Sequence, residues 1–218
     1  MLKFQERSNS WNMMMLAPFK TAKEHAKRKE LGFRDGLENF GTPIIMTYVP
    51  LVLLTLLLYG QLEFVSVLAA LFGLALAVLL IFISSFAFTA LAFGVAKLLG
   101  GKEKIGRLYY MVSLASAPTF VFTIVINIAT LILRKFLEDI YPSVAAAGAL
   151  QIIGNLVAIG VTFYGLYLLT VAINALYKFG SAKSLAVWLA PAALLLSIGA
   201  LFFGEIFMQA VRSLIRIL

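Results

Sequence analysis

The chain has 218 residues, of which 62% are hydrophobic and 13% are charged, and its formal net charge is +8 at pH 7. Soluble domains average about 45–50% apolar and about 25% charged residues, so water cannot be the solvent for this much apolar surface and lipid must be. We therefore attribute the positive charge to membrane topology and to anionic headgroups, and we expect no nucleic-acid partner. The sequence contains no cysteine, which excludes disulfides, thiolate metal sites and a cysteine nucleophile.

Residues 1–41 form a charged arm with no apolar stretch long enough for a signal peptide, so we expect the first apolar span to remain as an anchor. Trp11 and the three methionines after Asn12 suit either the headgroup region or a tail that covers the bundle. Pro18 opens the segment 19–31, which is rich in alanine, lysine and glutamate and predicts a short amphipathic helix on the cytoplasmic surface. Its lone His25 is expected to be solvated and to bind no metal.

Apolar stretches then predict an all-α, polytopic transmembrane helix bundle with five spans. The spans are expected at about 43–60, 65–99, 109–133, 149–176 and 184–203. The second would be about 52 Å long as a helix, which favours one tilted crossing over two. Residues 134–148 are expected to form a loop. The bundle is thus assigned to residues 42–204, and 205–218 are expected to form an interfacial helix.

Lysine and arginine divide unevenly between the two sides of a five-span chain. Fourteen lie on the side of the N-terminus: eight in 1–41, four from Lys97 to Arg107, and Lys178 with Lys183. Four lie on the other side, at 134, 135, 212 and 216. The positive-inside rule therefore predicts a cytoplasmic N-terminus and a C-terminus that is outside or lumenal.

The cytoplasmic loop 100–107 begins with two glycines, which favour a helix C-cap over a phosphate cradle. It also carries basic side chains that are candidates for contact with a protein partner or lipid headgroups, as does the arm. The candidates are Lys102, Lys104 and Arg107 in the loop and Lys23, Lys27 and Arg28 in the arm. The alternative is that these charges only set the topology.

The third span is the most polar of the five. Its polar side chains recur every three or four residues and so share one helix face: Ser113, Ser116, Thr119, Thr123, Asn127 and Thr130. Such a face either binds neighbouring helices or lines a wet cleft, and we favour the first. The candidate polar seam consists of Ser116, Thr119, Thr123 and Asn127 with Asn155 of the fourth span.

The spans have no ionisable side chain in their central parts, and the sequence has neither a GxxxxGK[ST] phosphate loop nor a His/Glu metal pattern. The only histidine lies in the arm, away from the serines and threonines of the spans. We therefore expect no enzyme activity, no catalytic residues, no cofactor and no metal.

Several sequence features occur along the chain in a characteristic order. They are Pro18 in the arm, the Gly100-Gly101 basic loop, Pro118 in the third span, and Tyr164-Gly165-Leu166-Tyr167 leading to the small-residue turn of 175–185. In this order the chain resembles the Yip domain family, polytopic membrane proteins named for interaction with Ypt/Rab GTPases. Residues 38–43 correspond only in part to the Asp-Leu-Tyr-Gly-Pro signature of the eukaryotic members. Ser113-Leu114 stands where those members have a Gly-Tyr pair before the proline of the third span. The chain is thus similar to the shorter prokaryotic members, and Rab binding does not carry over.

The resemblance implies a non-enzymatic scaffold or adaptor in membrane organisation or trafficking, in the plasma membrane of a prokaryote. The partners then expected are a bilayer with anionic headgroups, a cytoplasmic protein and a second copy of the chain. The alternative is a small-solute or lipid transporter or a permease subunit that uses the polar seam.

Overall fold

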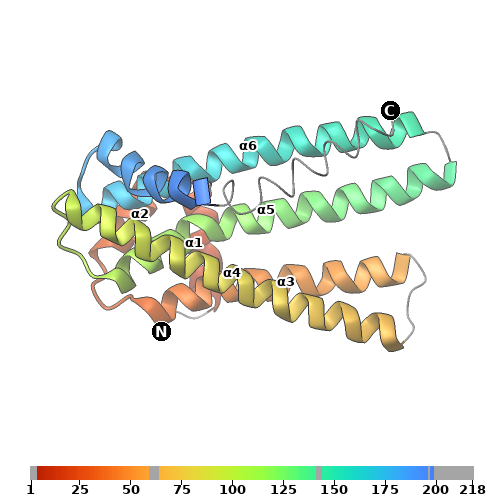
Figure 1. The fold of residues 1–218 in the computed structure, drawn as a ribbon, viewed down its shortest axis with the longest axis horizontal. Coiled ribbons are helices and arrows are strands. Elements are labelled where there is room, and N and C mark those ends of the chain that lie inside the picture. Colours follow the sequence, from red (N-terminus) through yellow and green to blue (C-terminus); the bar gives the residue numbers. More distant parts are fainter. Residues whose placement is uncertain (1–3, 59–63, 141–143, 196, 199–218) are drawn as a thin grey trace.

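The computed structural model describes residues 4–58, 64–140, 144–195 and 197–198 (Figure 1). The labelled helices are α1 (Phe4–Leu16), α2 (Pro18–Lys27), α3 (Phe33–Leu58), α4 (Phe64–Leu98), α5 (Ile105–Ile140) and α6 (Val144–Tyr177). A further apolar helical segment, Ser181–Leu195, follows α6. The described residues contain no strand, so the all-α prediction is confirmed.

Four stretches of the described chain are long and apolar enough to cross a membrane: Phe33–Leu58, Val67–Leu98, Ile105–Leu133 and Ile153–Tyr177. These helices satisfy their own backbone hydrogen bonds, as lipid requires. The segment Ser181–Leu195 is shorter. Most of the rest of the predicted fifth span and all of 205–218 lie outside the described residues, so the count of five spans stays a prediction.

Several helix boundaries differ from the expected ones. α3 begins at Phe33, ahead of the predicted span at 43, and continues through Pro43 and Pro50, because helices in lipid tolerate proline when neighbours satisfy the freed backbone. The predicted loop 134–148 was wrong at both ends, since α5 continues to Ile140 and α6 begins at Val144, ahead of the predicted start of the fourth span at 149. Neither glycine nor proline interrupts the chain there before Pro142.

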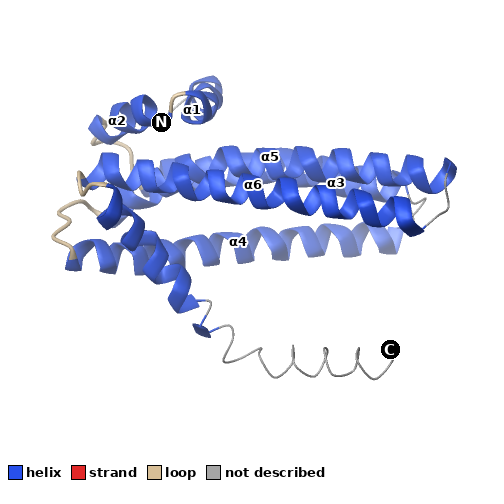
Figure 2. Ribbon diagram, turned by 90° about the horizontal axis from the view of Figure 1, so that it is seen from above, coloured by secondary structure: helices blue, strands red, loops and turns tan. Residues whose placement is uncertain are grey.

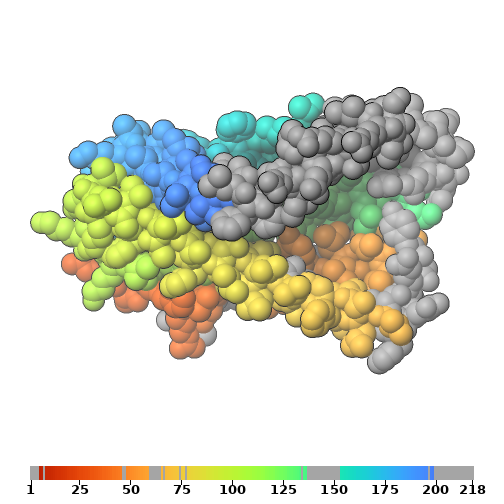
Figure 3. Space-filling view, viewed as in Figure 1, coloured from red at the N-terminus to blue at the C-terminus, as the bar shows by residue number. Residues whose placement is uncertain are grey.

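α5 lies at the centre of the bundle. It packs between α3 and α6, and α4 packs against α3 and α5. The arm helices α1 and α2 lie across the bundle on the side opposite to α4, at the end that carries the turns before α5 and after α6 (Figure 2). α4 is one continuous helix that runs along the outside of the molecule (Figure 3).

Burial is concentrated at the end of the bundle that α1 and α2 cover. The buried apolar side chains of α5 and α6 gather in 108–117 and 168–176, and they pack with Met14, Ala22 and Phe40. The opposite halves of the helices expose large apolar side chains, among them Leu57, Val65, Phe72 and Phe163. Exposed apolar side chains on spanning helices are the surface that lipid covers.

The connection from α4 to α5 is a glycine-terminated helix end. Gly100 adopts a left-handed φ of 91°, and the amides of Gly100 and Gly101 donate to the carbonyls of Lys97 (3.0 Å) and Ala96 (2.8 Å). These two bonds form a Schellman motif, which confirms the predicted C-cap. A Cβ on Gly101 would lie 2.8 Å from Cε1 of Tyr177, so the ends of α4 and α6 meet at this glycine.

Candidate functional site

The arm helix α2 is held on the bundle by a small buried face made of Thr21, Ala22 and His25. His25 Nδ1 and the hydroxyl of Tyr110 on α5 form a hydrogen bond of 2.5 Å. The expectation that His25 is solvated was therefore wrong. Burial most of all, then the charge of Arg28, lowers the pKa of His25 from its ordinary 6.5 to about 4, against an opposing effect of Glu24.

Arg107 connects the first turn of α5 to the end of α2. Its guanidinium forms an ion pair with Glu103 and donates a hydrogen bond to the carbonyl oxygen of Ala26. Carbonyls at a helix C-terminus lack intrahelical partners and attract cations, which explains the contact. Only 12% of the Arg107 side chain is exposed, so this predicted contact residue stabilises the docking of the arm.

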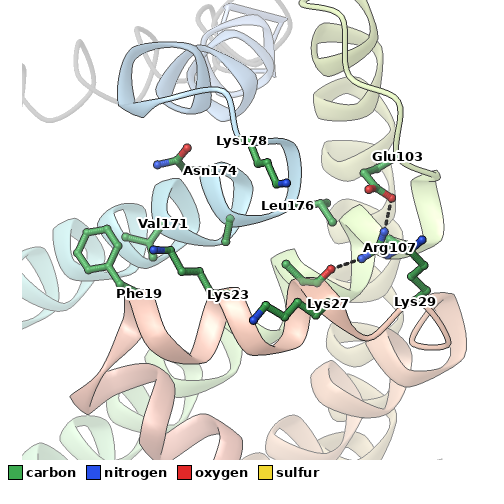
Figure 4. Close-up of a pocket in the computed structure, with 12 residues that line it drawn as sticks. Phe19, Lys23, Lys27, Lys29, Glu103, Arg107, Val171, Asn174, Leu176 and Lys178 are labelled. Carbon is green, nitrogen blue, oxygen red and sulfur yellow. Dashed lines mark hydrogen bonds and ion pairs between the residues drawn. The ribbon is translucent and has the colours of Figure 1, made fainter.

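A cavity of about 670 Å³ lies between α2 and α6 and is called here the α2–α6 cleft. It is lined by Phe19, Lys23, Ala26, Lys27, Lys29, Glu103, Arg107, Val171, Asn174, Ala175, Leu176 and Lys178. Lys23 and Lys27 border it from α2, and Lys178 borders it from the end of α6 (Figure 4). Among the described residues of its wall, five side chains are cationic and Glu103 is the single carboxylate. Such a cavity suits a phosphate or carboxylate group.

A second cavity, of about 850 Å³, lies between the α2–α3 connection and the loop before α5 and is called here the loop cleft. It is lined by Lys29, Glu30, Leu31, Gly32, Phe33, Phe86, Lys102, Glu103, Lys104, Ile105, Gly106 and Arg107. Phe33 and Phe86 meet edge to face at 5.7 Å and stay partly exposed. The loop cleft thus combines an apolar floor with a basic rim.

The predicted basic residues are divided between the two clefts. Lys23 and Lys27 line the α2–α6 cleft, Lys102 and Lys104 line the loop cleft, and Arg107 lies between them. Arg28 lies at the C-cap of α2, is exposed and lines neither cleft.

Sequence reasoning missed two lysines of the site. Lys29 lines both clefts, and Lys178 enters the α2–α6 cleft from a turn in which its own φ is 58°. The amide of Gly180 donates to the side-chain oxygen of Asn174 at 2.9 Å in the same turn. The charge count already placed Lys178 on the side of the arm, but no sequence signal indicated which lysines would face it.

Hydroxyl groups on the predicted polar face of α5 donate hydrogen bonds to carbonyl oxygens of the same helix. The hydroxyls of Ser113, Thr119 and Thr123 donate to the carbonyls of Tyr110, Ser116 and Thr119, respectively. Ser116 and Thr123 are half-buried, and Asn127 and Asn155 are exposed.

The polar face of α5 contacts α6 where its threonine side chains pack against glycines of α6. A Cβ on Gly165 would lie 2.8 Å from Cγ2 of Thr119, and one on Gly154 would lie 3.7 Å from Oγ1 of Thr130. Glycine at these positions lets α5 and α6 approach closely, as small residues do in membrane bundles.

A third cavity, of about 310 Å³, lies between the end of α1 and the α5–α6 pair and is called here the apolar groove. It is lined by Met15, Leu16, Pro118, Thr119, Phe122, Gly160, Val161 and Tyr164. The hydroxyl of Tyr164 donates to the carbonyl oxygen of Met15, which holds the end of α1 against α6. A Cβ on Gly160 would meet no atom within 4 Å.

The comparisons with known proteins give one finding. A family model described as Yip1 domain matches residues 14–203, which is most of the chain. Neither the curated proteins nor the solved structures gave a match.

Among the described residues, no group of three or more His, Cys, Asp or Glu side chains gathers in a way that could hold a metal ion.

Proposed function

The chain belongs to the Yip1 domain family, a family of non-enzymatic membrane proteins, and from this premise we propose that it is a non-enzymatic scaffold or adaptor in membrane organisation or trafficking. In this proposal a cytoplasmic protein docks at the loop cleft through an acidic segment that carries an apolar side chain. The protein is an integral membrane protein, and its proposed location is the plasma membrane of a prokaryote.

The observation that carries the proposal is the composition of the loop cleft. Phe33 and Phe86 offer an apolar floor that is 42% and 46% exposed, while Lys102 and Lys104 are exposed at the rim. An apolar anchor inside a charged rim is the usual anatomy of a protein interface. The basic rim favours an acidic partner and speeds its encounter.

The docking surface is also held by hydrogen bonds on both sides of the loop, and such preorganisation lowers the entropy lost on binding. The Schellman turn at Gly100 fixes one side of the loop. Arg107 fixes the other side through Glu103 and Ala26. A partner therefore meets lysines on a preformed platform.

The proposed topology has five spans, the arm and the loop cleft in the cytoplasm, and the C-terminus outside or lumenal. The asymmetric distribution of lysine and arginine supports it. In the fold, the arm, the loop before α5 and the turn after α6 lie at the same end of the bundle (Figure 1), as this topology requires.

The test is quantitative affinity capture of the full chain from native membranes, followed by mass spectrometry. Lys102→Glu/Lys104→Glu reverses the rim of the loop cleft. Lys20→Glu/Lys183→Glu is the matched control, because both residues are exposed on the same proposed side and line neither cleft.

We expect the rim variant to lose a set of proteins that the wild type and the control retain, with all three chains inserted alike by protease protection. Equal capture by the rim variant and the control would overturn the proposed docking role.

A further inference from the structure

The α2–α6 cleft and the apolar groove lie along the same helix. α6 contributes Asn174 and Lys178 to the cleft and Gly160 and Tyr164 to the groove. The arm covers both, since Lys23 of α2 borders the cleft and Met15 of α1 borders the groove. One surface path therefore has a basic end and an apolar end.

An aromatic row joins these two ends. Phe19, which lines the cleft, meets Tyr167 edge to face at 6.2 Å. Tyr167 lies 5.9 Å from Tyr164, which lines the groove. All three rings are partly exposed. Tyrosine beside apolar surface is typical of the boundary between headgroups and hydrocarbon.

The spacing along this path matches half a bilayer. Asn174 and Gly160 are separated on α6 by about 21 Å, at 1.5 Å per residue. A membrane is about 40–45 Å thick with its headgroups, so its midplane lies about 20 Å below the headgroup surface. A lipid whose headgroup lies beside Asn174 would place its acyl chain beside Gly160.

From the order of charges, aromatic rings and apolar surface we infer that this path binds one anionic glycerophospholipid, with its phosphate in the α2–α6 cleft and one acyl chain in the apolar groove. Lys23, Lys27 and Lys178 neutralise the phosphate. Phe19, Tyr167 and Tyr164 border the glycerol and upper chain, and Gly160 leaves room for the chain because it has no side chain.

This site is separate from the proposed docking of a cytoplasmic protein. Lys102 and Lys104, on which that docking depends, do not line the α2–α6 cleft. Variants of Lys23 and Lys27 leave both rim lysines in place. The two ideas can therefore fail independently.

The experiment is native mass spectrometry of the full chain, purified from nanodiscs that contain phosphatidylglycerol and phosphatidylcholine in equal amounts. Lys23→Gln/Lys27→Gln removes two charges from the cleft, and Lys20→Gln/Arg28→Gln removes two exposed charges of the same segment that line neither cleft. Lys23→Arg/Lys27→Arg keeps the charge of the cleft.

We expect one phosphatidylglycerol on the wild type, on the control and on the arginine variant. Retention should fall about thirtyfold in Lys23→Gln/Lys27→Gln, since two lysines near an anionic surface are removed. An equal loss of phosphatidylglycerol from Lys20→Gln/Arg28→Gln would show that retention depends only on the general surface charge, and would overturn the inference.

The acyl chain is tested with Gly160→Phe, because a Cβ at this position meets no atom within 4 Å, the added ring takes up space in the groove, and phenylalanine has better helix propensity than glycine. Gly73→Phe is its control, because Gly73 is an open glycine on α4. We expect Gly160→Phe to lower the retention of phosphatidylglycerol and Gly73→Phe to leave it unchanged. Wild-type retention in Gly160→Phe would overturn the inference.

Inorganic phosphate distinguishes a lipid from a soluble anion. Added in excess to the purified chain, it should leave phosphatidylglycerol bound, because the acyl chain contributes to binding. Displacement of the lipid by inorganic phosphate would mean that the cleft holds only a soluble anion and would overturn the inference.

Discussion

The hydroxyl of Tyr110 and Nδ1 of His25 form a buried hydrogen bond between residues 85 positions apart. It joins the arm to the central helix of the bundle at a point where α2 has few other buried side chains. The position of α2, and with it one wall of the α2–α6 cleft, depends on this contact.

Tyr110→Phe should loosen α2. The substitution leaves the buried imidazole without the phenol, and the loss of one partner of a buried hydrogen bond costs about 1–3 kcal/mol. Hydrogen exchange of the α2 amides should become faster, while the amides of α6 keep their wild-type rates. An equal increase in both helices would contradict a local role for the bond.

Acidification should also release α2. Its docked state holds His25 neutral with a pKa of about 4, whereas the released state regains the ordinary 6.5. Between these values the released state binds the additional proton, so docking is fully stable above about pH 6.5 and weakens as the pH falls toward 4.

A spin label at Lys20→Cys reports this release, because the chain has no other cysteine and Lys20 is exposed. Its mobility should rise through the pH window of 6.5 to 4. In a His25→Asn background the mobility should not change over the same window. A rise that persists in that background would assign the transition to other groups.

Gly165→Ala should separate α5 from α6. Its Cβ would lie 2.8 Å from Cγ2 of Thr119, and such overpacking costs about 1–3 kcal/mol. Thermal denaturation in detergent should show the loss. Adding Thr119→Ser removes the clashing methyl group while keeping the hydroxyl, so the double variant should recover most of the stability. No recovery would contradict the close contact.

Gly101→Ala should destabilise the turn before α5, because the new Cβ would lie 2.7 Å from the carbonyl oxygen of Ala96. We expect a loss of about 1–3 kcal/mol in thermal denaturation. Gly94→Ala is the matched control, since Gly94 is a helical position with open space. It should be neutral or stabilising by up to about 1 kcal/mol.

The long apolar stretches were enough to predict most of the bundle, because each one is too long to be anything but a helix in lipid. α4 is continuous from Phe64 to Leu98, as its uninterrupted apolar sequence indicated. The start of α3 was harder to predict, because Arg34, Asp35 and Glu38 look like part of a charged arm although they continue the helix.

The site was only partly predictable for a related reason. Charged neighbours in the sequence made His25 look solvated, but its spacing from Thr21 and Ala22 places it on the buried face of α2. That Lys23 and Lys178 line the same cleft depends on the length of α6 and the angle at which α2 crosses it. No local pattern in the sequence encodes that angle.

The length of α4 has a consequence for the membrane. Its 35 residues span about 52 Å, whereas the hydrocarbon core is about 30 Å thick. On α4, Phe82 lies beside Gly41 of α3, and Ser85 is hydrogen-bonded to Tyr109 of α5. We expect the acyl chains to end near this level. α2 then lies at the membrane surface beside Asn174, and the last turns of α4 hold the lysine-bearing loops above that surface.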